Sequence, residues 1–103
     1  MNVSEYLVTL NVPPSLEESL VDCLLTFESN DGFSSLKVNA HDHDHQSKNL
    51  SIAEQVSGQQ KKIRFQMYVP ENQLQPLLDK LKHQYTGSGV HYWVMPIIES
   101  GYL

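Results

Sequence analysis

Apolar and polar residues alternate along four separate stretches of the chain, with the two-residue period of a half-buried β-strand. The pattern is clearest in 61–69, where Ile63 and Phe65 point to one side while Lys62 and Arg64 point to the other. Pro13 closes the first of these stretches and Pro70 closes the third. The alternation therefore predicts four strands, over 6–12, 33–40, 61–69 and 90–95.

Two further stretches repeat their apolar residues at helical spacing. The first, 16–27, follows Ser15 and Glu18, a pair that predicts a capping box in which each side chain bonds the other residue's backbone amide. In the second, Pro76 conflicts with a helix unless it lies near the first turn. The apolar repeat still predicts a helix there, on the residues Leu74, Leu77, Leu78, Leu81 and Tyr85.

The predicted elements follow the order βαββαβ. Two such half-units pack into the ferredoxin-like α+β arrangement, a four-stranded antiparallel sheet with two helices on one face. We therefore expect a single domain over 1–103. The sheet face without helices would carry Leu7, Tyr68 and either Tyr92 or Trp93, which is a rich apolar set for a surface in water. Self-association would cover that face, so we expect a homo-oligomer.

Apolar residues become sparse between the second and third predicted strands. The resulting excursion, 40–60, exceeds the roughly 12–15 residues beyond which loops in compact domains are uncommon unless they are functional or disordered. Its first half is polar, and we expect it to be poorly ordered without a ligand. Its second half contains a capping-box pattern at Ser51 and Glu54, which predicts a short docked helical turn over 51–56.

Charge and composition exclude several classes of protein. The chain has 103 residues with 12 acidic and 7 basic side chains, a formal net charge of −5. Binding to a nucleic-acid backbone needs a basic patch, and the cluster of Lys61, Lys62 and Arg64 is too small for one. The single Cys23 cannot form an internal disulfide. No apolar run matches a membrane span or a signal peptide, so we expect a cytoplasmic protein that is not membrane-embedded.

Three histidines alternate with two aspartates in the string 41–45. Neutral imidazole nitrogens suit zinc, copper, nickel and cobalt, and carboxylates can complete the ligand sphere. In an extended chain His41 and His43 lie on the same side about 6.6–6.8 Å apart, so both rings can reach one ion. His45 can join after a bend, and Asp44 supplies a carboxylate. The string thus predicts a divalent transition-metal site, and a solvated polar loop is the alternative.

Two residues outside this string are further candidate ligands. His91 interrupts an apolar strand and is either a metal ligand at a subunit boundary or a packed histidine with one hydrogen bond. Glu54 is either a ligand from the excursion or a surface acid. Cys23 falls on the apolar face of the first helix and is predicted to be a core residue. His83 is predicted to be a cation at a helix end.

Three motifs, taken with the element order, resemble a known group of proteins. They are LVTLNVPP at 7–14, LSIAEQVSG at 50–58 and HYWVMP at 91–96. The chain resembles the PII signalling proteins and their CutA-type relatives, and most of all a small uncharacterised bacterial PII-like family often encoded beside heavy-metal efflux pumps. The resemblance implies a homotrimer, a T-loop-like role for 40–60, and a partner tied to metal efflux, such as a transporter.

The chain departs from PII where PII proteins hold nucleotide phosphates. Their Gly-rich loop ends in a basic residue, whereas here TGSGVH at 86–91 contains no Lys or Arg. Its two glycines favour a helix cap and turn, so no nucleotide is expected. The chain also lacks a nucleophile elbow, an HExxH motif and a P-loop. We therefore expect no enzyme activity and no catalytic residues.

These observations lead to three hypotheses. The first is a PII-like regulatory or metal-binding protein, linked to transition-metal homeostasis or efflux, that binds a divalent ion through the His-rich loop. The second is a metal-independent interaction adaptor for a transporter or another protein. The third is a small-molecule sensor that uses the intersubunit cleft near Gly87 and Gly89.

Overall fold

The strands and helices follow the predicted order. The computed structural model describes residues 4–27, 32–41 and 59–103. Each strand begins and ends within two residues of its predicted bounds. The elements are β1 Glu5–Val12, the 3₁₀ helix η1 Pro14–Leu16, α1 Glu17–Leu25, β2 Ser34–His41, β3 Gln59–Pro70, α3 Glu71–Tyr85 and β4 His91–Pro96.

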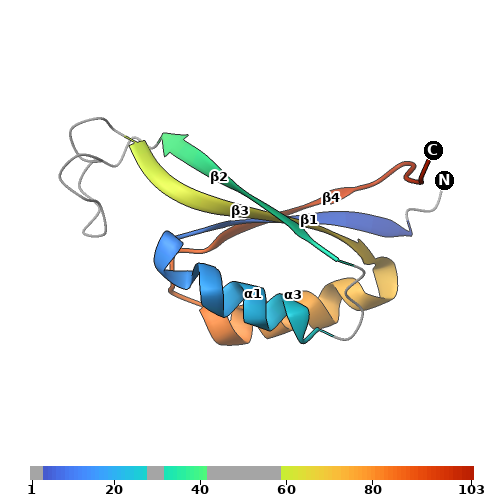
Figure 1. The fold of residues 1–103 in the computed structure, drawn as a ribbon. Coiled ribbons are helices and arrows are strands. Elements are labelled where there is room, and N and C mark those ends of the chain that lie inside the picture. The colour runs from blue at the N-terminus through green and yellow to red at the C-terminus, as the bar shows by residue number, and fades with distance from the viewer. Residues whose placement is uncertain (1–3, 28–31, 42–58) are drawn as a thin grey trace.

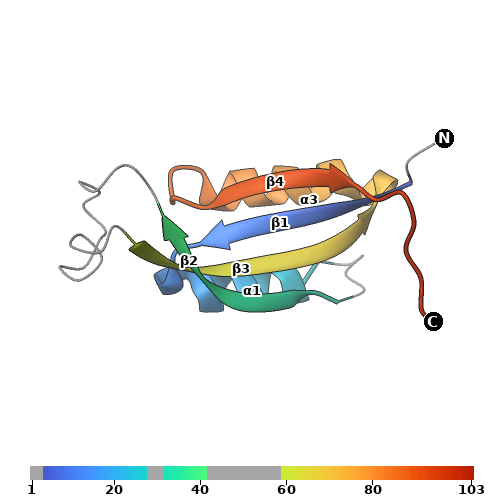
Figure 2. The same ribbon diagram turned by 90° about the horizontal axis from the view of Figure 1, so that it is seen from above.

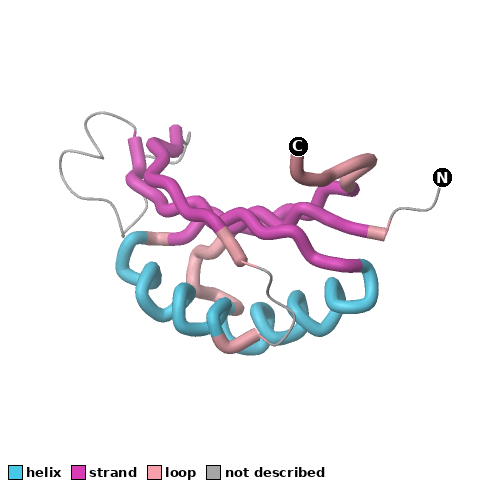
Figure 3. The backbone as a smooth tube through the Cα atoms, turned by 45° about the vertical axis from the view of Figure 1, so that its right-hand side comes forward, coloured by secondary structure: helices cyan, strands magenta, loops and turns pink. Residues whose placement is uncertain are grey.

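The strands form one antiparallel sheet in the order β2-β3-β1-β4. Both helices lie against the same face of the sheet (Figures 1 and 3). The opposite face, which we call the open face, is turned toward the viewer in Figure 2. This arrangement confirms the predicted ferredoxin-like α+β fold.

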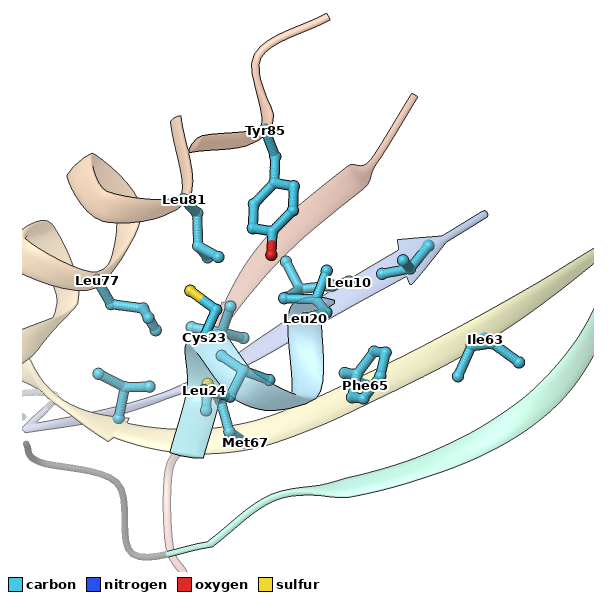
Figure 4. Packing of buried hydrophobic residues seen from close by; sticks show 13 residues of the cluster. Leu10, Leu20, Cys23, Leu24, Ile63, Phe65, Met67, Leu77, Leu81 and Tyr85 are labelled. Atoms are coloured by element: carbon cyan, nitrogen blue, oxygen red, sulfur yellow. The ribbon is translucent and has the colours of Figure 1, made fainter. Parts of the chain in front are cut away.

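The core lies between the sheet and the two helices. In the central strands every second side chain points toward the helices, and Val8 and Phe65 are fully buried there. The helices complete the core with apolar side chains that recur at helical spacing, among them the fully buried Leu20 of α1 and Leu77 of α3 (Figure 4). The predicted core position of Cys23 is confirmed, since its side chain is buried between the helices and the sheet.

The start of α1 differs from the prediction. The capping box between Ser15 and Glu18 is wrong, because α1 begins at Glu17 and no side chain of the described residues caps it. The two preceding prolines fix their φ angles and lead the chain into a 3₁₀ turn. The Leu16 N–H closes this turn by donating to the Pro13 carbonyl at 2.9 Å. Ser15 therefore lies inside a turn and lacks the extended backbone of an N-cap residue.

α3 begins three residues before its apolar repeat. Its first residue is Glu71, so Pro76 lies in the second turn and not near the first. A proline here leaves the Asn72 carbonyl, four residues earlier, without its intrahelical partner. Both residues are exposed, so solvent can hydrate that carbonyl. The predicted position of His83 at a helix end is confirmed, because it lies with Lys82 in the last turn.

β2 turns its apolar side chains away from the helices. Leu36 lies opposite Arg64 and Val38 opposite Lys62, so all four share the open face. The helix side of β2 carries only polar residues, and all four are exposed: Ser35, Lys37, Asn39 and His41. β2 thus adds little to the core and extends the apolar area of the open face.

The open face carries the apolar residues predicted for it. Leu7, Tyr68 and Met95 line up across β1, β3 and β4, and the latter two are 58% and 51% exposed. Of the two aromatic candidates in β4, Trp93 takes this face opposite Thr9. Tyr92 lies opposite Leu10, on the side of the helices.

The predicted excursion is bounded by β2 and β3. β2 ends at His41 and β3 begins at Gln59. Residues 42–58, with the helical turn predicted over 51–56, lie outside the described residues, so that part stays a prediction. Neither described helix combines the length and apolar character that a membrane crossing needs.

Candidate functional site

A hollow opens at the end of the sheet where β1 and β2 end and β3 and β4 begin. The antiparallel order brings these four strand ends to one edge. The hollow has a volume of about 420 Å³, and we call it the strand-end hollow. Its lining residues are Asn11, Ala40, His41, Gln60, Lys62, Gly89 and His91.

Two predicted metal ligands, His41 and His91, line this hollow. They come from β2 and β4, the two outer strands, and both are exposed. The ring centroid of His91 lies 5.1 Å from that of Trp93, with the planes tilted by 55°. His91 is thus packed against an aromatic ring and is still exposed. The ring contact agrees with a packed histidine, and the exposure leaves the imidazole accessible to a metal ion.

The other predicted ligands, His43, Asp44, His45 and Glu54, lie outside the described residues. Within the described ranges, no three His, Cys, Asp or Glu side chains are grouped closely enough to hold a metal ion. A metal bound at His41 therefore needs ligands from 42–58 or from another chain, and the complete ligand set stays a prediction.

A basic residue is fixed beside the hollow by contacts across three strands. Arg64 of β3 is half-buried on the open face, and its Nε donates to the Oδ1 of Asn11 in β1 at 2.8 Å. Its guanidinium carbon lies 5.3 Å from the ring centroid of Trp93 in β4, within the range of a cation–π contact. Asn11 belongs both to this network and to the lining of the hollow.

The glycine turn before β4 forms the rim of the hollow. Gly87 and Gly89 have φ values of 81° and 88°, in the left-handed region that favours glycine. The Ser88 N–H donates to the Tyr85 carbonyl at 3.0 Å, and the Val90 N–H donates to the Ser88 hydroxyl at 3.3 Å. The predicted helix cap and turn is thus confirmed.

Two groups with raised pKa values lie away from the hollow, between the helices. Burial raises the pKa of the Cys23 thiol, and the Lys80 cation and a hydrogen bond with Tyr85 oppose this only in part. Burial likewise raises the pKa of Tyr85, against a hydrogen bond with Ser19. Cys23 therefore stays protonated at neutral pH, which suits a packing residue better than a nucleophile.

The sequence prediction missed Asn11, Lys62 and Arg64 as site residues. It sought a basic residue directly after the glycines, where a PII protein carries one, and found none. In the structure the bases near this edge come from β3 instead. The alternation in 61–69 already placed Lys62 and Arg64 away from the core, and this pattern was the available indication.

The comparisons identify the family. The family model described as "Protein of unknown function (DUF3240)" matches residues 3–103. No curated protein matches the chain. The crystal structure of a DUF3240 family protein from Shewanella baltica OS155 is 24% identical, with a TM-score of 0.78, and the match covers 100% of this chain and 99% of that one.

Two other solved structures share the fold at lower identity. CPII, a nitrogen regulatory PII-like protein from Thiomonas intermedia K12, bound to ADP, AMP and bicarbonate, is 14% identical with a TM-score of 0.70, covering 96% of each chain. CutA from Synechococcus elongatus PCC7942, complexed with Bis-Tris, is 13% identical with a TM-score of 0.71, covering 97% of this chain and 86% of that one. The predicted PII-like and CutA-like resemblance is confirmed, and the chain belongs to the DUF3240 family.

Proposed function

We propose that this protein is a PII-like regulatory protein that binds a divalent transition-metal ion (zinc, copper, nickel or cobalt) at the strand-end hollow. The observation that carries the proposal is that His41 and His91, 50 positions apart in the sequence and on the two outer strands of the sheet, line the same hollow. Both are exposed, so an ion from solvent can reach them. Imidazole is a preferred ligand of these metals.

The chain places further ligands next to this point. His41 is the last residue of β2, so His43, Asp44 and His45 follow it directly. Lys62 in the lining repels a cation, and the carboxylate of Asp44 would offset that repulsion. We propose His41, His43 and His45 as the main ligands, with Asp44, Glu54 or, at a subunit boundary, His91 of another copy completing the sphere.

Metal binding would act by changing the surface that the 40–60 excursion presents to a partner. Ligands on both sides of the β2 boundary would tie the 40–60 excursion to the sheet edge, and a partner that contacts the excursion would respond. The family resemblance favours a component of a metal-efflux system, such as a transporter, as this partner. We propose that the protein is cytoplasmic and acts by binding, without catalysis.

We also propose that the protein assembles as a homotrimer. The open face supports this proposal, because it carries Leu7, Leu36, Tyr68, Trp93 and Met95 without any covering layer from the described chain. Apolar sheet faces of this kind are usually covered.

Calorimetric titration of tag-free protein with zinc, nickel and copper at pH 7.5 tests the metal proposal. Replacing His41 and His43 together with Ala should remove most of the binding, whereas His83→Ala, a change of an exposed histidine on α3, should not. Ordinary imidazole protonates near pH 6.5, so affinity should be much lower at pH 5.5. A double variant that binds like the parent would overturn histidine ligation and favour the metal-independent adaptor.

A second candidate function is a small-molecule sensor at the same hollow. Lys62 and the glycine turn favour it, because Gly89 exposes backbone with a positive φ beside a cationic side chain. CPII, which shares the fold, is solved with ADP, AMP and bicarbonate. Small-molecule binding that survives the loss of His41 and His43 would distinguish this function from the metal site.

A further inference from the structure

The open face holds a group of cationic side chains beside the strand-end hollow. Lys62 and Arg64 are two residues apart on β3, so both point to the open face, with Cα atoms about 7 Å apart. Both are half-buried. His91 of β4 lies next to them across Asn11, which is paired with Arg64 on one side and with His91 on the other.

The described acidic residues lie elsewhere. Glu5 shares the open face but lies at the far end of β1, where it accepts a hydrogen bond from Ser100 at 3.0 Å. Glu99 follows the end of β4, also at that far end. The remaining ones belong to the helix layer: Glu17, Glu18, Asp22, Glu71 and Asp79. Among these, Glu17 lines a neighbouring hollow together with Lys62, on the helix side of β2 and β3. In the described part of a chain with net charge −5, this is therefore a local region of positive charge.

Arg64 is held in position before any ligand arrives. The hydrogen bond to Asn11 uses its Nε, and the guanidinium carbon lies over the Trp93 ring. A guanidinium group has five N–H donors, and the Asn11 contact uses one of them. The terminal nitrogens are the pair that binds an oxyanion in bidentate geometry. An arginine fixed in this way loses little further freedom on binding.

We propose that Arg64 and Lys62 form a binding site for a small oxyanion, of the carboxylate or phosphate class, on the open face beside the strand-end hollow. Arg64 binds two of its oxygens through its terminal nitrogens, and Lys62 contributes a second positive charge. His91, exposed at the same edge, adds a third donor. The site uses side chains from β3 and β4 and does not require a metal ion.

Trp93 provides a direct readout, because it is the only tryptophan in the chain and contacts the guanidinium group of Arg64. Citrate and phosphate are titrated in turn into tag-free protein that has been stripped of metal with EDTA and then dialysed free of EDTA, at constant ionic strength, with chloride as the control anion. We expect a saturable change in tryptophan emission with at least one of the two oxyanions and none with chloride. Whichever of the two binds more tightly identifies the ligand class.

Variants of the basic residues distinguish a specific binding site from general electrostatic attraction. Arg64→Gln should weaken binding at least tenfold and Lys62→Gln several-fold. Lys61→Gln removes the same charge from the neighbouring residue, whose side chain points to the other face, and should change affinity less than twofold. If Arg64→Gln does not fold, Arg64→Lys keeps the charge and should still lose bidentate binding. Equal losses in all variants, or no binding by the parent, would overturn the proposal.

One further outcome also counts against a free ligand. If Arg64→Gln lowers the oligomer mass and the parent binds no anion, then a carboxylate of a second copy fills the site. Because the protein is free of metal throughout this titration, a negative result does not bear on the metal proposal. Loss of metal binding in the histidine variants likewise does not bear on the oxyanion site.

Discussion

The hydroxyl groups of Ser19 and Tyr85 lie 2.8 Å apart and form a hydrogen bond that joins α1 to α3. Tyr85 is buried, and its ring packs in the core (Figure 4). Its hydroxyl meets that of Ser19, an exposed residue of α1. The two residues are 66 positions apart in the sequence, so this contact forms only when both helices have docked on the sheet.

Removing this hydrogen bond should lower stability moderately. Tyr85→Phe keeps the ring and should cost about 1 kcal/mol in the free energy of unfolding, measured by urea denaturation. Ser19→Ala should cost a similar amount, and the double variant should cost clearly less than the sum. Full additivity would show that the two hydroxyl groups do not interact.

The raised pKa values of Cys23 and Tyr85 predict loss of stability in alkali. A group whose pKa is higher in the folded state contributes its full stabilisation below its unfolded value, and that contribution falls as the pH rises toward the folded value. The free energy of unfolding should therefore decrease above about pH 8.5, the ordinary value for a thiol. Cys23→Ala should delay the decrease until about pH 10, where Tyr85 alone responds. A flat profile in the parent from pH 7 to 10.5 would contradict this prediction.

Replacing Thr9 with valine should increase the stability of the fold. Its side chain is 1% exposed, and its hydroxyl oxygen has no hydrogen-bond partner among the described residues. A buried polar atom without a partner costs free energy, so Thr9→Val should stabilise the fold by about 1 kcal/mol in thermal or urea unfolding. Thr9→Ser, which keeps the hydroxyl and loses a methyl group, is the control and should destabilise. Destabilisation by Thr9→Val would show that a partner is present in solution.

The open face should be the surface of self-association. Light scattering of tag-free protein should give a mass near three chains, and Met95→Glu should reduce it, because an interface core disfavours an unpaired charge. Leu25→Glu changes a residue of α1 that is 65% exposed, on the opposite layer, and should leave the mass unchanged. A parent that stays monomeric at all concentrations would show that the open face is not an interface.

The fold was largely predictable because its determinants are local. Alternation in 61–69 defined β3 and its two faces, and helical spacing defined α1 and α3 to within a turn. The local errors came from prolines. Pro13 and Pro14 replaced a capping box by a 3₁₀ turn, and Pro76 proved compatible with the second turn of a helix.

The candidate site was less predictable because it depends on strand order and register. His41 and His91 were both candidates, but only the order β2-β3-β1-β4 shows that they line one hollow. The contacts of Arg64 depend on Asn11 pairing with β3 and β4 at once. No periodicity within a single strand contains that information.

The position of β1 has a consequence for the time course of folding. β1 is the earliest described strand, yet it pairs only with β3 and β4, and its nearest paired residue is Ile63. During synthesis, Val8, Leu10 and Val12 thus leave the ribosome long before the strands that will flank them. Pairings that close such long loops are slow to form and leave apolar segments exposed in the meantime. The nascent chain therefore passes through an interval in which its most deeply buried strand has no partner.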